Sequence, residues 1–158
     1  MRSWRRARAL DLFIGWSIFQ IAFDPQDGHN HAAFWTQALL GSKPSVLVIE
    51  GIEDPLVPNN ATRSLAYTLD WVPQLDAIVP VSYLPKARGT VTGNVDTQTT
   101  AAHIQYVPAG LPDLEASVGC ETQENGHFCA QIAADSIAER VLFFQSAVDD
   151  GVPRIGTP

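Results

Sequence analysis

The sequence has few basic residues and no stretch in which they alternate with aromatic side chains. Its 158 residues include 10 Lys and Arg against 17 Asp and Glu, a formal net charge of -7. Four of those bases lie close to the start of the chain, so the remainder is strongly acidic: Arg2, Arg5, Arg6 and Arg8. Nucleic-acid binding depends mainly on neutralising phosphates with Lys and Arg. We therefore expect no nucleic-acid partner.

The sequence also lacks an apolar run long enough to cross a bilayer. The stretch 9–23 is shorter than the ~20 residues that a spanning helix needs, and Asp11 and Gln20 interrupt it. We expect no stable membrane span. Two interpretations of residues 1–23 stay open. Arginines followed by apolar residues are typical of an export signal, whereas a set of residues at helical spacing indicates a packed helix: Leu10, Phe13, Ile14, Ser17, Ile18 and Ile21.

No cofactor motif is present. The segment 89–93 has two glycines but lacks the lysine and the strand-to-helix context of a phosphate-binding loop. One group of side chains has the chemistry of zinc ligands, but no second ligand group stands at a familiar distance from it: Asp24, Asp27, His29 and His31. Acids ahead of a helix are also common caps. We expect neither a cofactor nor a metal.

The chain contains two cysteines, Cys120 and Cys129, which lie on either side of His127. Free thiols and a disulfide both stay open. A disulfide would close a small loop around the histidine and would require an oxidising compartment. The compartment itself stays unknown.

The composition is that of a globular protein, with 46% hydrophobic and 17% charged residues. Strand-like runs lie at Val46–Ile49, Ala77–Val81 and Ile104–Val107. The first is a continuous apolar, β-branched run, which is typical of a strand buried on both faces of a parallel sheet. We therefore predict a single α/β domain with a partial parallel sheet and flanking helices.

The chain divides into four segments. We predict an N-terminal helix over residues 1–23, and a helix, a strand and a following helix over 24–72. Residues 73–100 are rich in Pro, Gly, Thr and Asn and are predicted to form an irregular insertion. Residues 101–158 are expected to form the last strand, a loop and a closing helix. Within these segments Asn59 or Asn60 is predicted to cap the helix that follows the strand and Pro58. The closing helix is predicted over Ala130–Val148.

Two residues are the best candidates for chemistry. Asp54 follows the first strand, and His127 lies on a polar loop ahead of the closing helix. Reactive groups of open α/β sheets collect at the carboxyl ends of the strands. An oriented acid and an imidazole base are two members of a catalytic triad. Weaker candidates are Glu50 and Glu53 for the acid and His103, expected to be a strand-face residue, for the base.

The pattern around these residues resembles a known fold. The string Gly51-x-x-Asp54-x-x-Val57-Pro58, followed by a helix, a strand, Gly126-His127-Phe128 and a final helix, resembles the C-terminal part of the α/β-hydrolase fold. It is most similar to bacterial lipase- and esterase-like members, over roughly residues 20–155. The resemblance implies hydrolysis of a small carboxylic ester by a serine, with His127 as base and Asp54 orienting it.

One part of that pattern is missing. The family carries its nucleophile in a Gly-x-Ser-x-Gly turn ahead of the acid, and no such pentapeptide occurs here. The nearest string, Gly15–Phe19, has Ser17 but no second glycine. We therefore expect the C-terminal portion of a serine hydrolase, inactive alone, whose serine lies in a missing half or on a partner chain. The alternative is a non-catalytic interaction module.

Overall fold

The protein is built around a four-stranded parallel sheet. The computed structural model describes residues 31–32 and 43–156. The sheet order is β1-β5-β2-β3, and every neighbouring pair is parallel. The bounds are β1 (Val46–Gly51), β2 (Gln74–Leu75), β3 (Lys86–Ala87) and β5 (Ala101–Tyr106). The predicted α/β class with a parallel sheet is therefore present.

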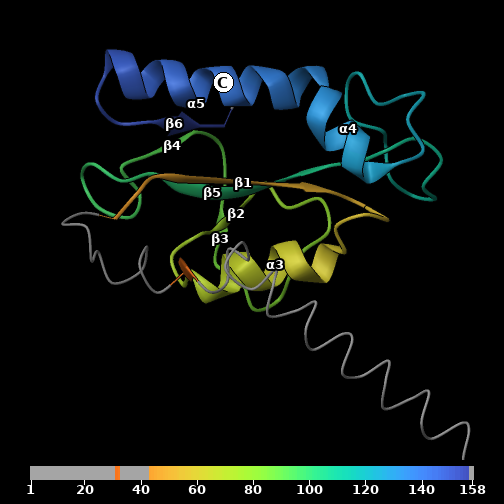
Figure 1. The fold of residues 1–158 in the computed structure, drawn as a ribbon, viewed down its shortest axis with the longest axis horizontal. Helices are drawn as coiled ribbons and strands as arrows, with labels where there is room; N and C mark the ends of the chain where they lie inside the picture. Colours follow the sequence, from red (N-terminus) through yellow and green to blue (C-terminus); the bar gives the residue numbers. More distant parts are fainter. Residues whose placement is uncertain (1–30, 33–42, 157–158) are drawn as a thin grey trace, which may run out of the picture.

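Helices cover both faces of this sheet (Figure 1). One face carries α3 (Asn59–Thr68), and the other carries α4 (Gly126–Ile132) and α5 (Ala134–Asp149). A small antiparallel pair, β4 (Val91–Thr92) and β6 (Arg154–Ile155), lies beside α5. The helices of the described segments are too short or too polar to cross a membrane.

The core forms on both faces because the side chains of β1 alternate. Val48 packs on the α3 side with Leu69 and Val72. Leu47 packs on the opposite side with Phe143 of α5. β1 and β5 pair over their whole length, from Val46 opposite Ala101 to Gly51 opposite Tyr106. The ends of these two strands thus lie side by side and set the position of the loops that follow them.

Two of the three predicted strands are confirmed, and one is wrong. The run at 46–49 continues to Gly51, and the run at 104–107 begins earlier, at Ala101. Residues 77–81 form no strand. Their backbone N–H groups donate to two buried glutamine side chains instead of to a neighbouring strand. Gln105 Oε1 accepts the N–H groups of Ile78 and Val79, and Gln74 Oε1 accepts that of Val81. The insertion at 73–100 nevertheless contributes β2, β3 and β4.

Two helix predictions need correction. The closing helix is split at Ala133, whose ψ of 132° interrupts it. Ser136 Oγ and Arg140 Nη2 donate to the carbonyls of Ala130 and Gln131, and so satisfy the end of α4. In α3 no asparagine side chain caps the first turn, and the capping position is Pro58. Residues 1–23, Asp24, Asp27 and His29 lie outside the described residues.

Candidate functional site around Asp54 and His127

The loop after β1 holds the carboxylate of Asp54 in one orientation. Its Oδ1 accepts hydrogen bonds from the backbone N–H groups of Leu56 and Val57, both at 2.8 Å. An Asp side chain that bonds the backbone two and three residues ahead fixes a tight local turn. The second oxygen, Oδ2, is therefore directed away from the loop and toward α4.

His127 stands in the first turn of α4 and faces that oxygen. Asn125 accepts the backbone N–H of His127 at 2.9 Å and caps the helix. The ring Nδ1 of His127 lies 2.9 Å from Oδ2 of Asp54. The structure thus brings together two residues that are 73 positions apart in the sequence.

Two glycines allow the two loops to approach this closely. A Cβ on Gly51 would lie 1.9 Å from the carbonyl oxygen of Gly126, and a Cβ on Gly126 would lie 2.0 Å from that of Ile52. No side chain fits in either place. The end of β1 and the start of α4 are therefore in backbone contact, and this contact sets the distance between Asp54 and His127.

The electrostatics favour an ionised carboxylate at Asp54. Burial by itself would raise the pKa of Asp54, but the hydrogen bonds from Val57, Leu56 and His127 outweigh burial and hold this pKa below its ordinary value of 3.8. An ionised carboxylate only accepts, so Nδ1 of His127 carries the proton of this hydrogen bond. In the neutral ring, Nε2 is then an unprotonated acceptor.

The Nε2 side of the imidazole faces a hollow of about 210 Å³. Its walls come from the end of β1, the acid loop, α3, α4 and α5, and include Ile49, Gly51, Thr62, Gln131 and Arg140. The His127 side chain is 26% exposed and the Asp54 side chain only 9%. Within the hollow the amide Nε2 of Gln131 lies 2.9 Å from Nε2 of His127 and donates to it.

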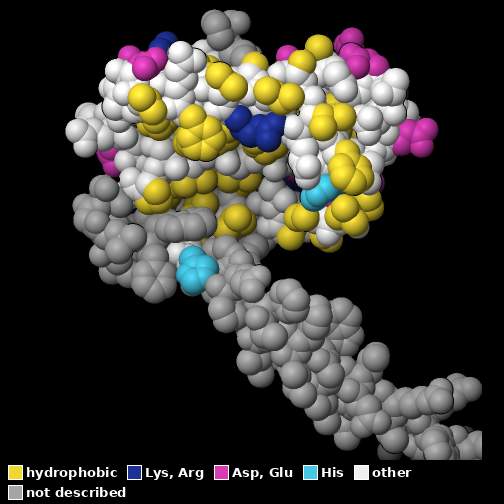
Figure 2. All heavy atoms as spheres, turned by 45° about the horizontal axis from the view of Figure 1, so that its top comes forward, with side chains coloured by type: hydrophobic (Ala, Val, Ile, Leu, Met, Phe, Trp, Pro, Cys, Tyr) yellow, Lys and Arg dark blue, Asp and Glu magenta, His cyan; other side chains and the backbone are white. Residues whose placement is uncertain are grey.

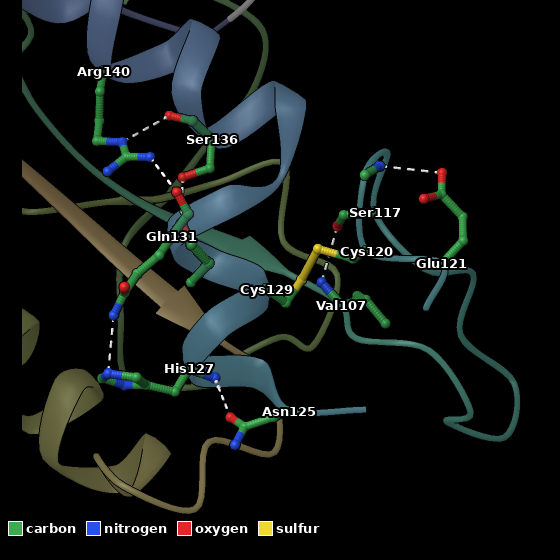
Figure 3. The surroundings of a disulfide bond; sticks show 12 residues. Val107, Ser117, Cys120, Glu121, Asn125, His127, Cys129, Gln131, Ser136 and Arg140 are labelled. Carbon is green, nitrogen blue, oxygen red and sulfur yellow. Dashed lines mark hydrogen bonds between the residues drawn. A yellow bond between two sulfur atoms is a disulfide. The ribbon is translucent and has the colours of Figure 1, made fainter. Parts of the chain in front are cut away.

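A disulfide anchors the other side of α4 (Figure 3). Cys120 and Cys129 are bonded, which settles the alternative left open by the sequence. In Figure 3 the disulfide ties α4 to the preceding loop, and His127 points from the opposite side of the helix. Both cysteines are fully buried. The covalent link fixes the helix that carries His127 without touching the imidazole.

The weaker candidates lie elsewhere. Glu50 and His103 are fully buried beneath the sheet, where Glu50 Oε2 lies 2.7 Å from Nε2 of His103. Arg63 and Gln105 donate to the same carboxylate. His103 is thus the strand-face residue that was expected. Glu53 is exposed on the turn, with a φ of 54°.

Sequence reasoning missed Gln131 and Asn125. Gln131 lies four residues after His127 on the same helix face, a spacing that predicts contact once the helix is known. Asn125 directly precedes the helix, where asparagine is a favoured cap. The described ranges, which include His31, hold no cluster of three potential metal ligands.

Comparison with known proteins adds no family assignment. No protein-family model, no curated protein and no solved structure matches this chain.

Proposed function

We propose that Asp54 and His127 are the acid and base of a serine carboxylic-ester hydrolase, and that the nucleophilic serine lies on a polypeptide outside this sequence. The observation that carries the proposal is the 2.9 Å contact between Nδ1 of His127 and Oδ2 of Asp54 at the rim of a hollow. The α/β architecture and the placement of both residues after strands agree with the C-terminal part of the α/β-hydrolase fold.

The chemistry follows from the two ring nitrogens. The serine hydroxyl attacks the ester carbonyl and gives its proton to Nε2 of His127. The Asp54 carboxylate stabilises the imidazolium through Nδ1. The imidazolium then protonates the departing alcohol, and water hydrolyses the resulting acyl-serine with His127 again as base. Asp54 keeps its charge throughout.

The same site explains why this chain alone should not turn over esters. It offers a base, but its sequence contains no Gly-x-Ser-x-Gly turn, beside which this family builds the oxyanion hole. Gln131 donates to Nε2 in the position that an incoming hydroxyl would use. A serine-bearing segment must therefore displace the Gln131 amide before proton transfer.

That same hydrogen bond favours the second candidate, a non-catalytic interaction module. If Gln131 holds Nε2 permanently, the Asp54, His127 and Gln131 chain is a structural lock between the acid loop and α4. The two functions differ in whether His127 can accept a proton from an added hydroxyl.

The test supplies the missing nucleophile as a small molecule. Phenyl acetate is incubated with trifluoroethanol and the purified chain, and formation of trifluoroethyl acetate is followed. The variants are His127→Ala, Asp54→Ala and, as a matched control, His31→Ala. General-base assistance accounts for about 100-fold or more in organised active sites. We expect a smaller but measurable acceleration that His127→Ala and Asp54→Ala remove and His31→Ala keeps.

Equal rates for all proteins would favour the structural lock. An acyl group bound covalently to a residue of this chain, lost in both site variants, would mean that this chain carries its own nucleophile, and would contradict the proposed division between two polypeptides.

A further inference from the structure

The outer edge of β1 has no partner strand among the described residues. In the sheet order β1 is terminal and pairs only with β5. In Figure 1 β1 lies in front of β5, so this edge faces the reader. The unpaired N–H and C=O groups of an edge strand form a template for pairing with another strand.

The hydrogen-bond pattern identifies which backbone groups are available. Val46 N–H donates to Thr100 and Ile52 N–H to Tyr106, so the even-numbered residues of β1 direct their backbone toward β5. In a parallel ladder the alternate residues direct theirs away. These are Leu47, Ile49 and Gly51, and the Gly51 carbonyl already accepts from the Asn59 side chain.

Within the described β1, the residues of the open edge include none that would block pairing. Its sequence from Val46 to Ile49 contains no lysine, proline or glycine, although such residues commonly block edge strands. Figure 2 shows hydrophobic side chains gathered on the face that carries α5. On α5 a helical stripe is exposed: Ile137, Val141, Phe144 and Val148. An open edge bordered by apolar surface is a typical interaction site.

We propose that this edge pairs with β1 of a second copy of the chain in an antiparallel, two-fold symmetric contact. Leu47 of each copy lies opposite Ile49 of the other, and each pair exchanges two backbone hydrogen bonds. Val48 then stands on the two-fold axis, and the hydrogen bond from Asn59 to Gly51 stays intact. The two four-stranded sheets join into one.

Charge complementarity selects this register. The same alignment brings Lys43, ahead of one β1, near Glu53, after the other, and does so twice because of the symmetry. Glu53 is exposed and Lys43 half-exposed, standing over the Trp71 ring at 5.6 Å. The symmetry also places both α5 helices on one face of the joined sheet.

Sedimentation velocity of the full chain tests the proposal, over a series from about 1 µM to about 1 mM, where weak interfaces dissociate. We expect a concentration-dependent dimer. Lys43→Glu should weaken dimerisation about tenfold, because two attractions become repulsions. The double swap Lys43→Glu with Glu53→Lys should restore it. Arg88→Glu, an equal charge reversal away from this edge, should leave it unchanged.

Leu47→Ala controls for the lost packing against Phe143. The backbone contribution is tested by Leu47→Pro, which removes an outward N–H without removing a hydrogen bond to β5. We expect this variant to be monomeric. A monomeric wild type at every concentration, assemblies larger than a dimer, or a double swap that fails to restore dimerisation would each overturn the proposal. The pKa of Asp96 is lowered mainly by the backbone hydrogen bond from Gln98 and least by the charge of Lys43. Because Lys43 thus acts within its own chain as well, thermal unfolding of each charge variant accompanies the measurement.

Discussion

At the scale of single residues, the site depends on the hydrogen-bond partners of the two ring nitrogens of His127. Nδ1 is held by the Asp54 carboxylate and Nε2 by the Gln131 amide. The first contact is set by a turn whose backbone fixes the acid. The second comes from an exposed side chain that can rotate away. Gln131 therefore controls access to Nε2, while Asp54 controls which nitrogen carries the proton.

Gln131→Ala should make His127 more reactive toward diethyl pyrocarbonate, whose carbonyl carbon is attacked by an unprotonated ring nitrogen. A hydrogen bond with a net value of about 1 kcal/mol corresponds to about a fivefold change in rate. Site-resolved mass spectrometry measures modification of His127 against time, with Gln98→Ala as the control on an exposed loop. An unchanged rate in Gln131→Ala would show that the amide does not restrict Nε2.

At the scale of elements, the site depends on the junction between β1 and α4. The junction has two supports, the backbone contact at Gly51 and Gly126 and the disulfide that holds α4 to its preceding loop. The first brings the acid and base loops together, and the second keeps the helix from moving. Each support can be removed separately.

Gly126→Ala should destabilise the fold and separate the acid from the base. The new Cβ would overlap the Ile52 carbonyl, and such overpacking costs about 1–3 kcal/mol. Urea unfolding measures the loss. The control Gly89→Ala also strains its backbone, since Gly89 has a φ of +64°, but its Cβ meets no atom. Equal losses for the two variants would argue against a tight backbone contact at Gly126.

Removing the disulfide should lower the free energy of unfolding by about 2–4 kcal/mol. The comparison is urea unfolding of Cys120→Ala/Cys129→Ala against the oxidised wild type. The wild type in a strong reductant should approach the double variant. Because the bond fixes α4 rather than the imidazole, the contact of His127 with Asp54 should become mobile without being chemically altered.

The helices and strands show which parts of the fold could be predicted from the sequence. The β-branched run at 46–49 and the strand near Ile104 were predictable because burial on both faces leaves a local apolar signature. The run at 77–81 has the same signature, but Gln74 and Gln105, distant in sequence, take its backbone hydrogen bonds. The break at Ala133 involves no proline or glycine, so nothing local predicted it.

The site itself was predictable in part. Asp54 and His127 follow strand and loop signals that the sequence contains, and the structure places them in contact. The role of Gly126 as a spacing residue depends on its approach to Ile52, which only the tertiary structure defines. The same holds for the contact between Glu50 and His103.

At the scale of the whole molecule, a buried polar cluster lies between the sheet and α3. Burial alone would raise the pKa of Glu50, but hydrogen bonds with His103 and Gln105 and the charge of Arg63 outweigh burial and hold this pKa below its ordinary value of 4.5. A lowered pKa in the folded state stabilises the protein above the unfolded value. That contribution is lost as the pH falls through the folded value.

Stability should therefore decline as the pH is lowered below about 4.5, and part of that slope should vanish in Glu50→Gln. The variant will also be less stable at neutral pH, because Arg63 and His103 lose their charged partner. Urea unfolding at a series of pH values separates the two effects. The same acid slope in wild type and variant would contradict the role given to Glu50.

Ile49 and Gly51 belong to the edge strand β1 and also line the hollow beside His127. A second copy paired along β1 and a serine-bearing polypeptide would therefore compete for neighbouring surface.

The roles of Asp54 and His127 as acid and base are tested most directly by ¹⁵N nuclear magnetic resonance at a pH where the His127 ring is neutral. The spectrum shows which of the two ring nitrogens carries the proton. We expect a proton on Nδ1 and none on Nε2, and we expect Asp54→Asn to abolish this preference. A proton on Nε2 in the wild type, or the same preference in Asp54→Asn, would contradict the assignment of Asp54 and His127 as acid and base.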